Sequence, residues 1–132
     1  MGLHLIRQKR YFKLGLVLIV LMAPTLGCPD KKQTLTVTAT AYNSLPGQTQ
    51  GDPNLTAWGD KLVPGIKAIA VSRDLLSMGL TRGVEVTIKG LPGTYVVMDK
   101  LNKRWKLRID IYMGTDIDAA RQWGKRAVMI SW

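Results

Sequence analysis

Residues 107–112 alternate apolar and polar side chains in the order Leu107-Arg108-Ile109-Asp110-Ile111-Tyr112. Successive side chains of a β-strand point to opposite faces, so the aliphatic residues share one face and Arg108, Asp110 and Tyr112 share the other. A strand with this pattern buries its aliphatic row and presents the aspartate on the opposite face. The fold therefore needs other strands to cover that aliphatic row.

The rest of the chain supplies such strands. Residues 34–42 alternate polar and apolar β-forming side chains, which is typical of a half-buried strand. Further short strands are expected at 67–72, 84–89, 94–99 and 126–132, with glycine-containing turns between several of them. Six short strands with irregular connections predict a mainly β domain that closes into a compact barrel.

Two helical segments and one long loop complete the expected architecture. A helix is expected with Thr115 as its N-cap, Asp116 and Asp118 in its first turn, and Gly124 at its end. A shorter helical turn is expected at 74–78. The stretch 44–65 contains three prolines and four glycines. It is too long for a simple turn, and loops of this length in compact domains are usually functional.

The N-terminal segment has the pattern of an export signal. Four basic residues and no acidic residue lie in the first thirteen positions, and an uncharged apolar run follows at 14–23. The run is shorter than the roughly 20 residues that span a bilayer core, although an uncleaved anchor is an alternative. The sequence thus predicts a signal at 1–27, a tether at 28–35 and one domain at 36–132.

Cys28 is the only cysteine and stands where the signal is expected to end. Its position after Leu26 and Gly27 resembles a bacterial lipobox, in which the cysteine is lipidated and anchors the protein to the membrane. The alternative is an ordinary signal with an unmodified thiol near its cleavage site. Either way, a chain with one cysteine forms no internal disulfide bond.

The mature part is basic. Fifteen of the 19 basic residues and all nine acidic residues lie from Cys28 onward, which leaves a formal net charge of +6 there. A basic domain outside the cytoplasm meets anionic lipid headgroups or the carboxylates of the cell wall. The export signal argues against nucleic acid as a partner, and we expect a protein of the cell envelope.

Elimination leaves carboxylates as the candidate catalytic groups. His4 is the only histidine and lies in the export segment. The domain therefore has no Ser-His-Asp or Cys-His arrangement and no zinc site made of histidine and cysteine. It also lacks an EF-hand, a Walker A motif and a dinucleotide-binding fingerprint, so no metal and no cofactor is expected.

Residues 97–112 carry a resemblance to a known family. An aspartate at 99, a second aspartate eleven positions later at 110, and the ending Ile109-Asp110-Ile111-Tyr112 resemble the core of the 3D domain, which is named for three aspartates. That domain occurs in membrane-bound lytic murein transglycosylase A and in small secreted muralytic proteins. The similarity extends over about residues 36–132, where the flanking segments 38–42, 68–71 and 120–124 agree more weakly.

The resemblance implies a fold and a reaction. It implies a six-stranded double-psi β-barrel with one or two short helices that cleaves the MurNAc–GlcNAc bond of peptidoglycan glycan strands and leaves 1,6-anhydro ends. Asp110 matches the catalytic acid and Asp99 the supporting aspartate, while Asp118 is preferred to Asp116 as the third. Arg108 lies on the face of Asp110 and favours a lower pKa, so a general acid at Asp110 requires burial or the charge of Asp99 to outweigh it.

Other residues are candidates for binding substrate. Asp60 and Trp58 lie in the long loop, where Trp58 is the better placed of the tryptophans to stack on a sugar ring. Tyr42 and Tyr112 either hydrogen-bond the substrate or pack. Plainer interpretations remain beside these: an ion-pair network of both aspartates with Lys100, Lys103, Arg104 and Arg108, a solvated basic loop, a peptidoglycan-binding module without catalysis, or a muramidase that uses water.

Overall fold

A computed structural model describes residues 31–47 and 51–132 of the 132-residue chain. The expected signal at 1–27 and the lipidation site Cys28 lie outside the described residues. The elements are β1 (Thr34–Tyr42), β2 (Ala68–Val71), α1 (Arg73–Ser77), β3 (Glu85–Ile88), β4 (Thr94–Lys100), β5 (Arg108–Tyr112), α2 (Ile117–Trp123) and β6 (Arg126–Ser131). Each of the six expected strands is present, with ends that differ by at most one residue.

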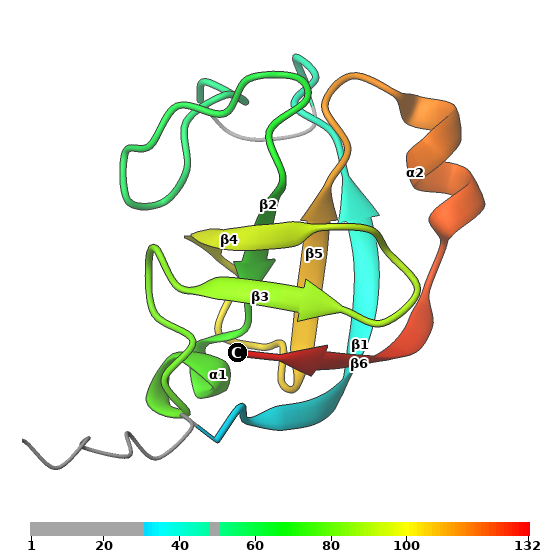
Figure 1. The fold of residues 1–132 in the computed structure, drawn as a ribbon. Helices are drawn as coiled ribbons and strands as arrows, with labels where there is room; N and C mark the ends of the chain where they lie inside the picture. Colours follow the sequence, from blue (N-terminus) through cyan, green and yellow to red (C-terminus); the bar gives the residue numbers. More distant parts are fainter. Residues whose placement is uncertain (1–30, 48–50) are drawn as a thin grey trace, which may run out of the picture. The chain divides into compact units, whose positions relative to one another are not determined.

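The six strands close into a barrel in the order β1-β5-β2-β4-β3-β6 (Figure 1). Two pairs are parallel, β1 with β5 and β2 with β4, and the antiparallel pairing of β2 with β5 joins them. Antiparallel pairs close the remainder of the barrel through β3 and β6. The predicted mainly β fold, a closed six-stranded barrel with two short helices, is confirmed.

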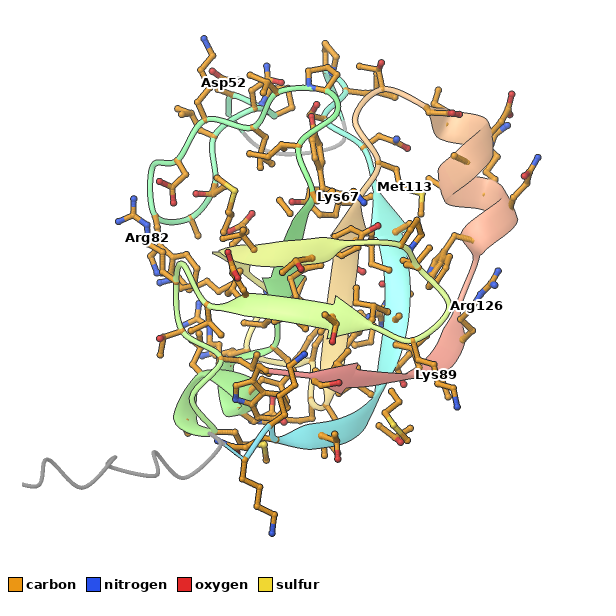
Figure 2. The ribbon with its side chains drawn as sticks, in the orientation of Figure 1. Asp52, Lys67, Arg82, Lys89, Met113 and Arg126 are labelled. Atoms are coloured by element: carbon orange, nitrogen blue, oxygen red, sulfur yellow. The ribbon has the colours of Figure 1, made fainter. Side chains whose placement is uncertain are left out.

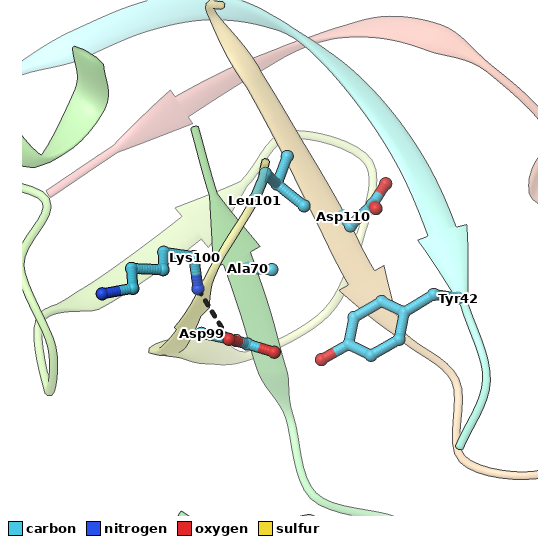
Figure 3. A pocket seen from close by; sticks show the side chains of 6 residues that line it. All are labelled: Tyr42, Ala70, Asp99, Lys100, Leu101 and Asp110. Carbon is cyan, nitrogen blue, oxygen red and sulfur yellow. Dashed lines mark hydrogen bonds between the residues drawn. The ribbon is translucent and has the colours of Figure 1, made fainter. Parts of the chain in front are cut away.

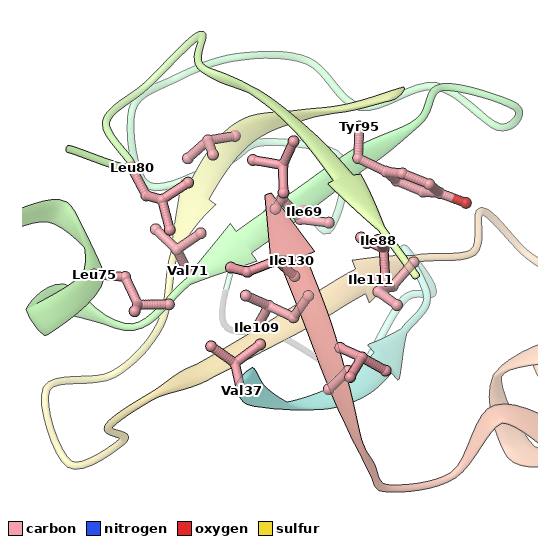
Figure 4. Close-up of a cluster of buried hydrophobic side chains, with 14 residues drawn as sticks. Val37, Ile69, Val71, Leu75, Leu80, Ile88, Tyr95, Ile109, Ile111 and Ile130 are labelled. Carbon is pink, nitrogen blue, oxygen red and sulfur yellow. The ribbon is translucent and has the colours of Figure 1, made fainter. Parts of the chain in front are cut away.

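The interior of the barrel is filled by every second residue of its strands. Ile109 and Ile111 of β5 are fully buried beside Ile69 and Val71 of β2, and Figure 4 shows how side chains from all sides meet there. Leu75 of α1 closes one end of this core. Burial of such aliphatic side chains contributes about 1.5–3 kcal/mol each, which makes the barrel core the main source of stability.

The first strand starts earlier than the expected domain boundary at residue 36. Thr34 and Leu35, expected in the tether, pair with Ser131 and Ile130 of β6. The backbone N–H of Gln33 donates to the Trp132 carbonyl at 2.8 Å, and the Trp132 N–H donates back at 3.1 Å. These two bonds satisfy backbone groups beside the start of β1 and the end of β6.

The N-cap of α2 differs from the expected one. Asp116, not Thr115, is the capping residue, and its carboxylate accepts a hydrogen bond from the Ala119 N–H at 2.9 Å. Asp118 lies in the first turn, as expected, and Gly124 ends the helix with a φ of 62°. In the described ranges 31–47 and 51–132, the helices are too short to cross a membrane.

The strand parity of β6 gives a matched test of the core. Ile130→Ala removes a fully buried side chain, and we expect it to lower the free energy of unfolding by about 2–5 kcal/mol. Met129 is the preceding residue and is 45% exposed. Met129→Ala is therefore expected to change stability by about 0.5 kcal/mol or less in the same urea titration. Equal losses from both variants would contradict the orientation of this strand.

A second pair of variants tests the helix cap. Asp116→Ala removes the acceptor for the Ala119 N–H and is expected to lower the free energy of unfolding by about 1 kcal/mol. Thr115→Ala should have a much smaller effect, because no hydrogen bond from Thr115 caps the helix in this structure. A larger loss from Thr115→Ala, measured by urea unfolding, would restore Thr115 as the cap.

Candidate functional site

A row of four side chains crosses the outer face of the barrel. The strand registers pair Thr40 with Asp110, Asp110 with Ala70, and Ala70 with Asp99. Paired residues of neighbouring strands point to the same face, so this row spans β1, β5, β2 and β4. The two aspartates singled out by the sequence therefore lie on either side of a single alanine.

A β-bulge brings Asp99 into this row. Simple alternation along β4 places Asp99 on the same face as Tyr95 and Val97, both of which are buried in the core. The register between β2 and β4 shifts at this point: Ile69 pairs with Val97, but Ala70 pairs with Asp99. The extra residue, Met98, reverses the direction of Asp99, which therefore points outward rather than into the core.

The small side chain of Ala70 leaves a hollow between the two carboxyl groups. A cavity of about 200 Å³ lies there, lined by Tyr42, Ala70, Asp99, Lys100, Leu101 and Asp110. Figure 3 shows Asp110 and Asp99 on different strands with Ala70 between them, and the Tyr42 ring along one side. The cavity is open to solvent and is large enough for part of a sugar ring rather than for a whole glycan strand.

Asp110 is a partly buried carboxyl group without an ion pair. Its Oδ1 atom is buried and has no hydrogen-bond partner in the structure. Burial raises the pKa of Asp110 above the ordinary aspartate value of 3.8, and the nearby charge of Arg108 only partly opposes this shift. Burial therefore affects the pKa of Asp110 more strongly than the charge of Arg108 does. A carboxyl group with a raised pKa is suited to donate a proton.

Arg108 is held near Asp110 by other partners. Its Nε and one terminal nitrogen donate to Thr40 Oγ1 at 3.2 and 3.0 Å. Its guanidinium also stacks on Trp105, 3.9 Å from the ring centroid. These contacts keep the charge close enough to influence Asp110 but not in a salt bridge with it.

The ion-pair alternative for the two aspartates is not supported. Within 31–47 and 51–132, the single salt bridge joins Arg82 and Asp60. Asp99 instead accepts hydrogen bonds at one carboxylate oxygen from the backbone N–H groups of Ala57 and Lys100, each at 2.8 Å. The Lys100 side chain extends away from that carboxylate, with its amine 5.7 Å from the Trp58 ring centroid (Figure 3).

Tyr42 forms the wall of the cavity on the β1 side. Its hydroxyl is buried and has no hydrogen-bond partner, and its pKa is raised far above the ordinary value of 10.0, first by burial and then by the charges of Asp99 and Asp110. The phenol therefore stays protonated and is a hydrogen-bond donor close to both carboxyl groups. The Tyr112 ring supports it, with the two ring centroids 5.4 Å apart.

The remaining sequence candidates lie outside the cavity lining. Tyr112 is buried and shares a hydrogen bond of 2.7 Å with Ser44, so it packs beneath Tyr42. Trp58 packs partly against the core, with Lys100 over its ring. Asp60 accepts from Arg82, whose side chain reaches the loop from the turn before β3 (Figure 2). Asp118 is exposed on α2.

Two lining residues, Ala70 and Leu101, were not singled out from the sequence, and Lys100 was named only as a member of the alternative ion-pair network. The pairing of β2 with β4 and β5 brings these residues beside the aspartates. The one available signal was the position of Lys100 and Leu101 directly after Asp99. In the part of the chain that the structure describes, no group of three or more histidine, cysteine or acidic side chains is placed to hold a metal ion.

Comparisons with known proteins were made for the whole chain. No protein-family model matches it, and no curated protein matches it. Among solved structures, it is similar to the apo form of an expansin from Clavibacter michiganensis, with a TM-score of 0.46 and 20% sequence identity. The similarity covers 74% of this chain and 49% of that one, so the chain spans about half the length of the expansin.

The raised pKa of Asp110 predicts a stability effect with a defined pH dependence. Above the folded-state pKa the ionised carboxylate is buried at a cost, so Asp110→Asn should increase the free energy of unfolding at pH 7. As the pH falls toward and below the ordinary value of 3.8, Asp110 becomes neutral in both states. The advantage of the variant should then disappear.

Urea unfolding at pH 7 and pH 3 measures this difference. Asp118→Asn is the matched control, because Asp118 is exposed at the start of α2, where a negative charge is favourable. That control should gain no stability at pH 7. A loss of stability at pH 7 in Asp110→Asn would contradict the inferred cost of burying the charge.

Proposed function

We propose that this chain is an exported murein lytic transglycosylase that cleaves the MurNAc–GlcNAc bonds of peptidoglycan glycan strands. The observation that carries the proposal is Asp110, which lines a solvent-open cavity, has a pKa raised by burial and forms no salt bridge. The resemblance of residues 97–112 to the 3D domain supplies the substrate and the reaction type.

Asp110 acts first as an acid and then as a base in this reaction. Its proton passes to the glycosidic oxygen as the bond from that oxygen to C1 of MurNAc breaks. The C6 hydroxyl oxygen of the same sugar bonds to C1, and its proton returns to Asp110. The reaction consumes no water and leaves a 1,6-anhydro end, so the two-carboxylate spacing of ordinary glycosidases does not apply.

The neighbours of Asp110 supply positioning and charge. Asp99 is fixed by two backbone N–H groups, so its carboxylate is held in one orientation across Ala70 from Asp110. The protonated hydroxyl of Tyr42 is a donor for a sugar hydroxyl that enters the cavity. A glycan oxygen in the cavity thus meets a carboxyl group with a raised pKa, a neutral hydroxyl donor and a fixed carboxylate.

The N-terminal sequence supports a location in the cell envelope. The basic start, the apolar run at 14–23 and the position of Cys28 suit a lipoprotein signal. The net charge of +6 from Cys28 onward suits a polymer that carries carboxylates.

Incubation of the purified full chain with isolated sacculi tests the proposal. We expect soluble muropeptides with 1,6-anhydro ends, which mass spectrometry separates from hydrolytic products by the mass of one water. Asp110→Asn should reduce their release by about 100-fold or more, as expected for loss of a general acid. Asp118→Asn is the control and should retain activity.

The other outcomes separate the alternatives. Products that contain the additional water would replace the lytic reaction by a muramidase on the same barrel. Binding to sacculi without release of muropeptides would contradict the enzymatic function and favour a peptidoglycan-binding module. Activity that survives Asp110→Asn would remove Asp110 as the acid.

A further inference from the structure

Arg108 is fixed in place with donors to spare. Two of its N–H groups are used by Thr40, and its backbone N–H donates to Ser72 Oγ at 3.0 Å. A guanidinium has five N–H donors arranged as a planar fork, so the others remain for a further partner. Stacking on Trp105 holds the plane of the fork without using any donor.

A second guanidinium adjoins the same ring. The Arg104 side chain lies 4.8 Å from the Trp105 ring centroid. The turn that presents it is held by the Arg104 N–H, which donates to Asn102 Oδ1, and by the Trp105 N–H, which donates to the Asn102 carbonyl. Contact with the Trp105 ring therefore holds two positively charged guanidinium groups closer together than they would lie in solvent.

Neither guanidinium of this stack forms a salt bridge with residues 31–47 or 51–132. In the described ranges, no carboxylate lies within salt-bridge distance of Arg104 or Arg108. The Asp74 carboxylate is engaged elsewhere, since it accepts the Leu107 N–H at 2.9 Å. The neighbouring Lys103 and Lys106 are exposed and add to the positive charge of the loop.

The stack does not line the cavity of Asp110, but Arg108 lies on the same face of the barrel. Arg108 precedes Asp110 by two residues on the same face of β5, and the Ser72 N–H pairs it with the end of β2. Leu101, which lines the cavity, donates its N–H to the carbonyl of Val71 next to Ser72. A ligand that fills the cavity and continues along this face therefore reaches the guanidinium of Arg108.

We propose that Arg108, Trp105 and Arg104 form a subsite for a carboxylate carried by the glycan substrate. This inference rests on the proposed function, because it takes the ligand of the cavity to be a glycan. A planar fork matches a carboxylate with two parallel hydrogen bonds. Arg108 is half-buried against the barrel, so an extended chain with single carboxylates reaches it better than a flat membrane, which would meet the exposed Lys103 and Lys106 first.

Equilibrium binding of the full chain carrying Asp110→Asn tests the subsite without any need for cleavage. Three probes are compared: sacculi, peptide-free glycan strands that retain the lactyl carboxylates, and neutral N-acetylglucosamine oligosaccharides. Arg108→Gln should weaken binding to sacculi about tenfold, as expected for loss of a charge-assisted pair, and leave binding to the neutral oligosaccharide unchanged. Arg108→Lys should recover only part of the loss, because it restores the charge without the fork.

The peptide-free strands distinguish the sources of the carboxylate. A tenfold loss of affinity for these strands in Arg108→Gln identifies the lactyl carboxylate as the ligand. A loss of affinity confined to sacculi identifies the carboxylates of the peptides. Arg121→Gln is the matched control, because Arg121 is exposed on α2 and its substitution removes the same charge. If Arg108→Gln fails to fold by circular dichroism, Arg104→Gln takes its place, with an expected loss of about threefold for one exposed pair.

Three results would overturn the subsite. The first is that Arg108→Gln binds sacculi as tightly as the protein without this substitution. The second is an equal loss of affinity for the neutral oligosaccharide, and the third is a loss of affinity for sacculi no larger than that caused by Arg121→Gln. Binding to anionic lipid vesicles that depends on Lys103 and Lys106 but not on Arg108 would assign the loop to a membrane instead. The experiment measures binding, so it can support the subsite even if the protein does not cleave sacculi. The subsite and the proposed reaction can therefore be contradicted independently.

Discussion

The structure depends on β5 lying between β1 and β2. This strand pairs in parallel with β1 and antiparallel with β2, and both of its isoleucines are buried. Because Ile109 and Ile111 must face the core, the residue between them must face outward. The outward direction of Asp110 is therefore set by the same burial that holds the barrel together.

The site itself arises from two local features of the neighbouring strands. Ala70 has almost no side chain above the sheet, which leaves the cavity open beside Asp110. The bulge in β4 then turns Asp99 toward this cavity, where regular alternation would have sent its carboxylate into the core. Bulges of this kind are found next to active sites because they redirect one side chain without disturbing the rest of the sheet. The long loop is tied to the same point, since the Ala57 N–H bonds Asp99.

The electrostatics of the site reflect a competition between burial and charge. Arg108 favours the ionised form of Asp110, yet its guanidinium is bound to Thr40 and stacked on Trp105, and burial prevails in raising the pKa of Asp110. Burial that raises the pKa of a carboxyl group costs stability when the group is ionised, and such a cost is common where function depends on a perturbed group. The anchoring of Arg108 also leaves part of its fork available to a ligand, so one set of contacts serves both the proposed acid and the proposed carboxylate subsite.

The sequence by itself determined the six strands, both helical segments and the outward face of Asp110, because these depend on local alternation, turn residues and helix-terminal charge. It also limited the catalytic candidates to carboxylates, because composition alone shows that histidine and cysteine are absent from the domain. Tertiary structure decided the rest. Whether Asp99 faces the cavity depends on a register shift between two strands, and Asp60 is engaged by Arg82, which is 22 residues away in the chain. Tyr112 packs beneath Tyr42, and Ala70 becomes the floor of the site, only once distant strands are paired. Such contacts depend on which strands become neighbours, and no pattern within one segment encodes that.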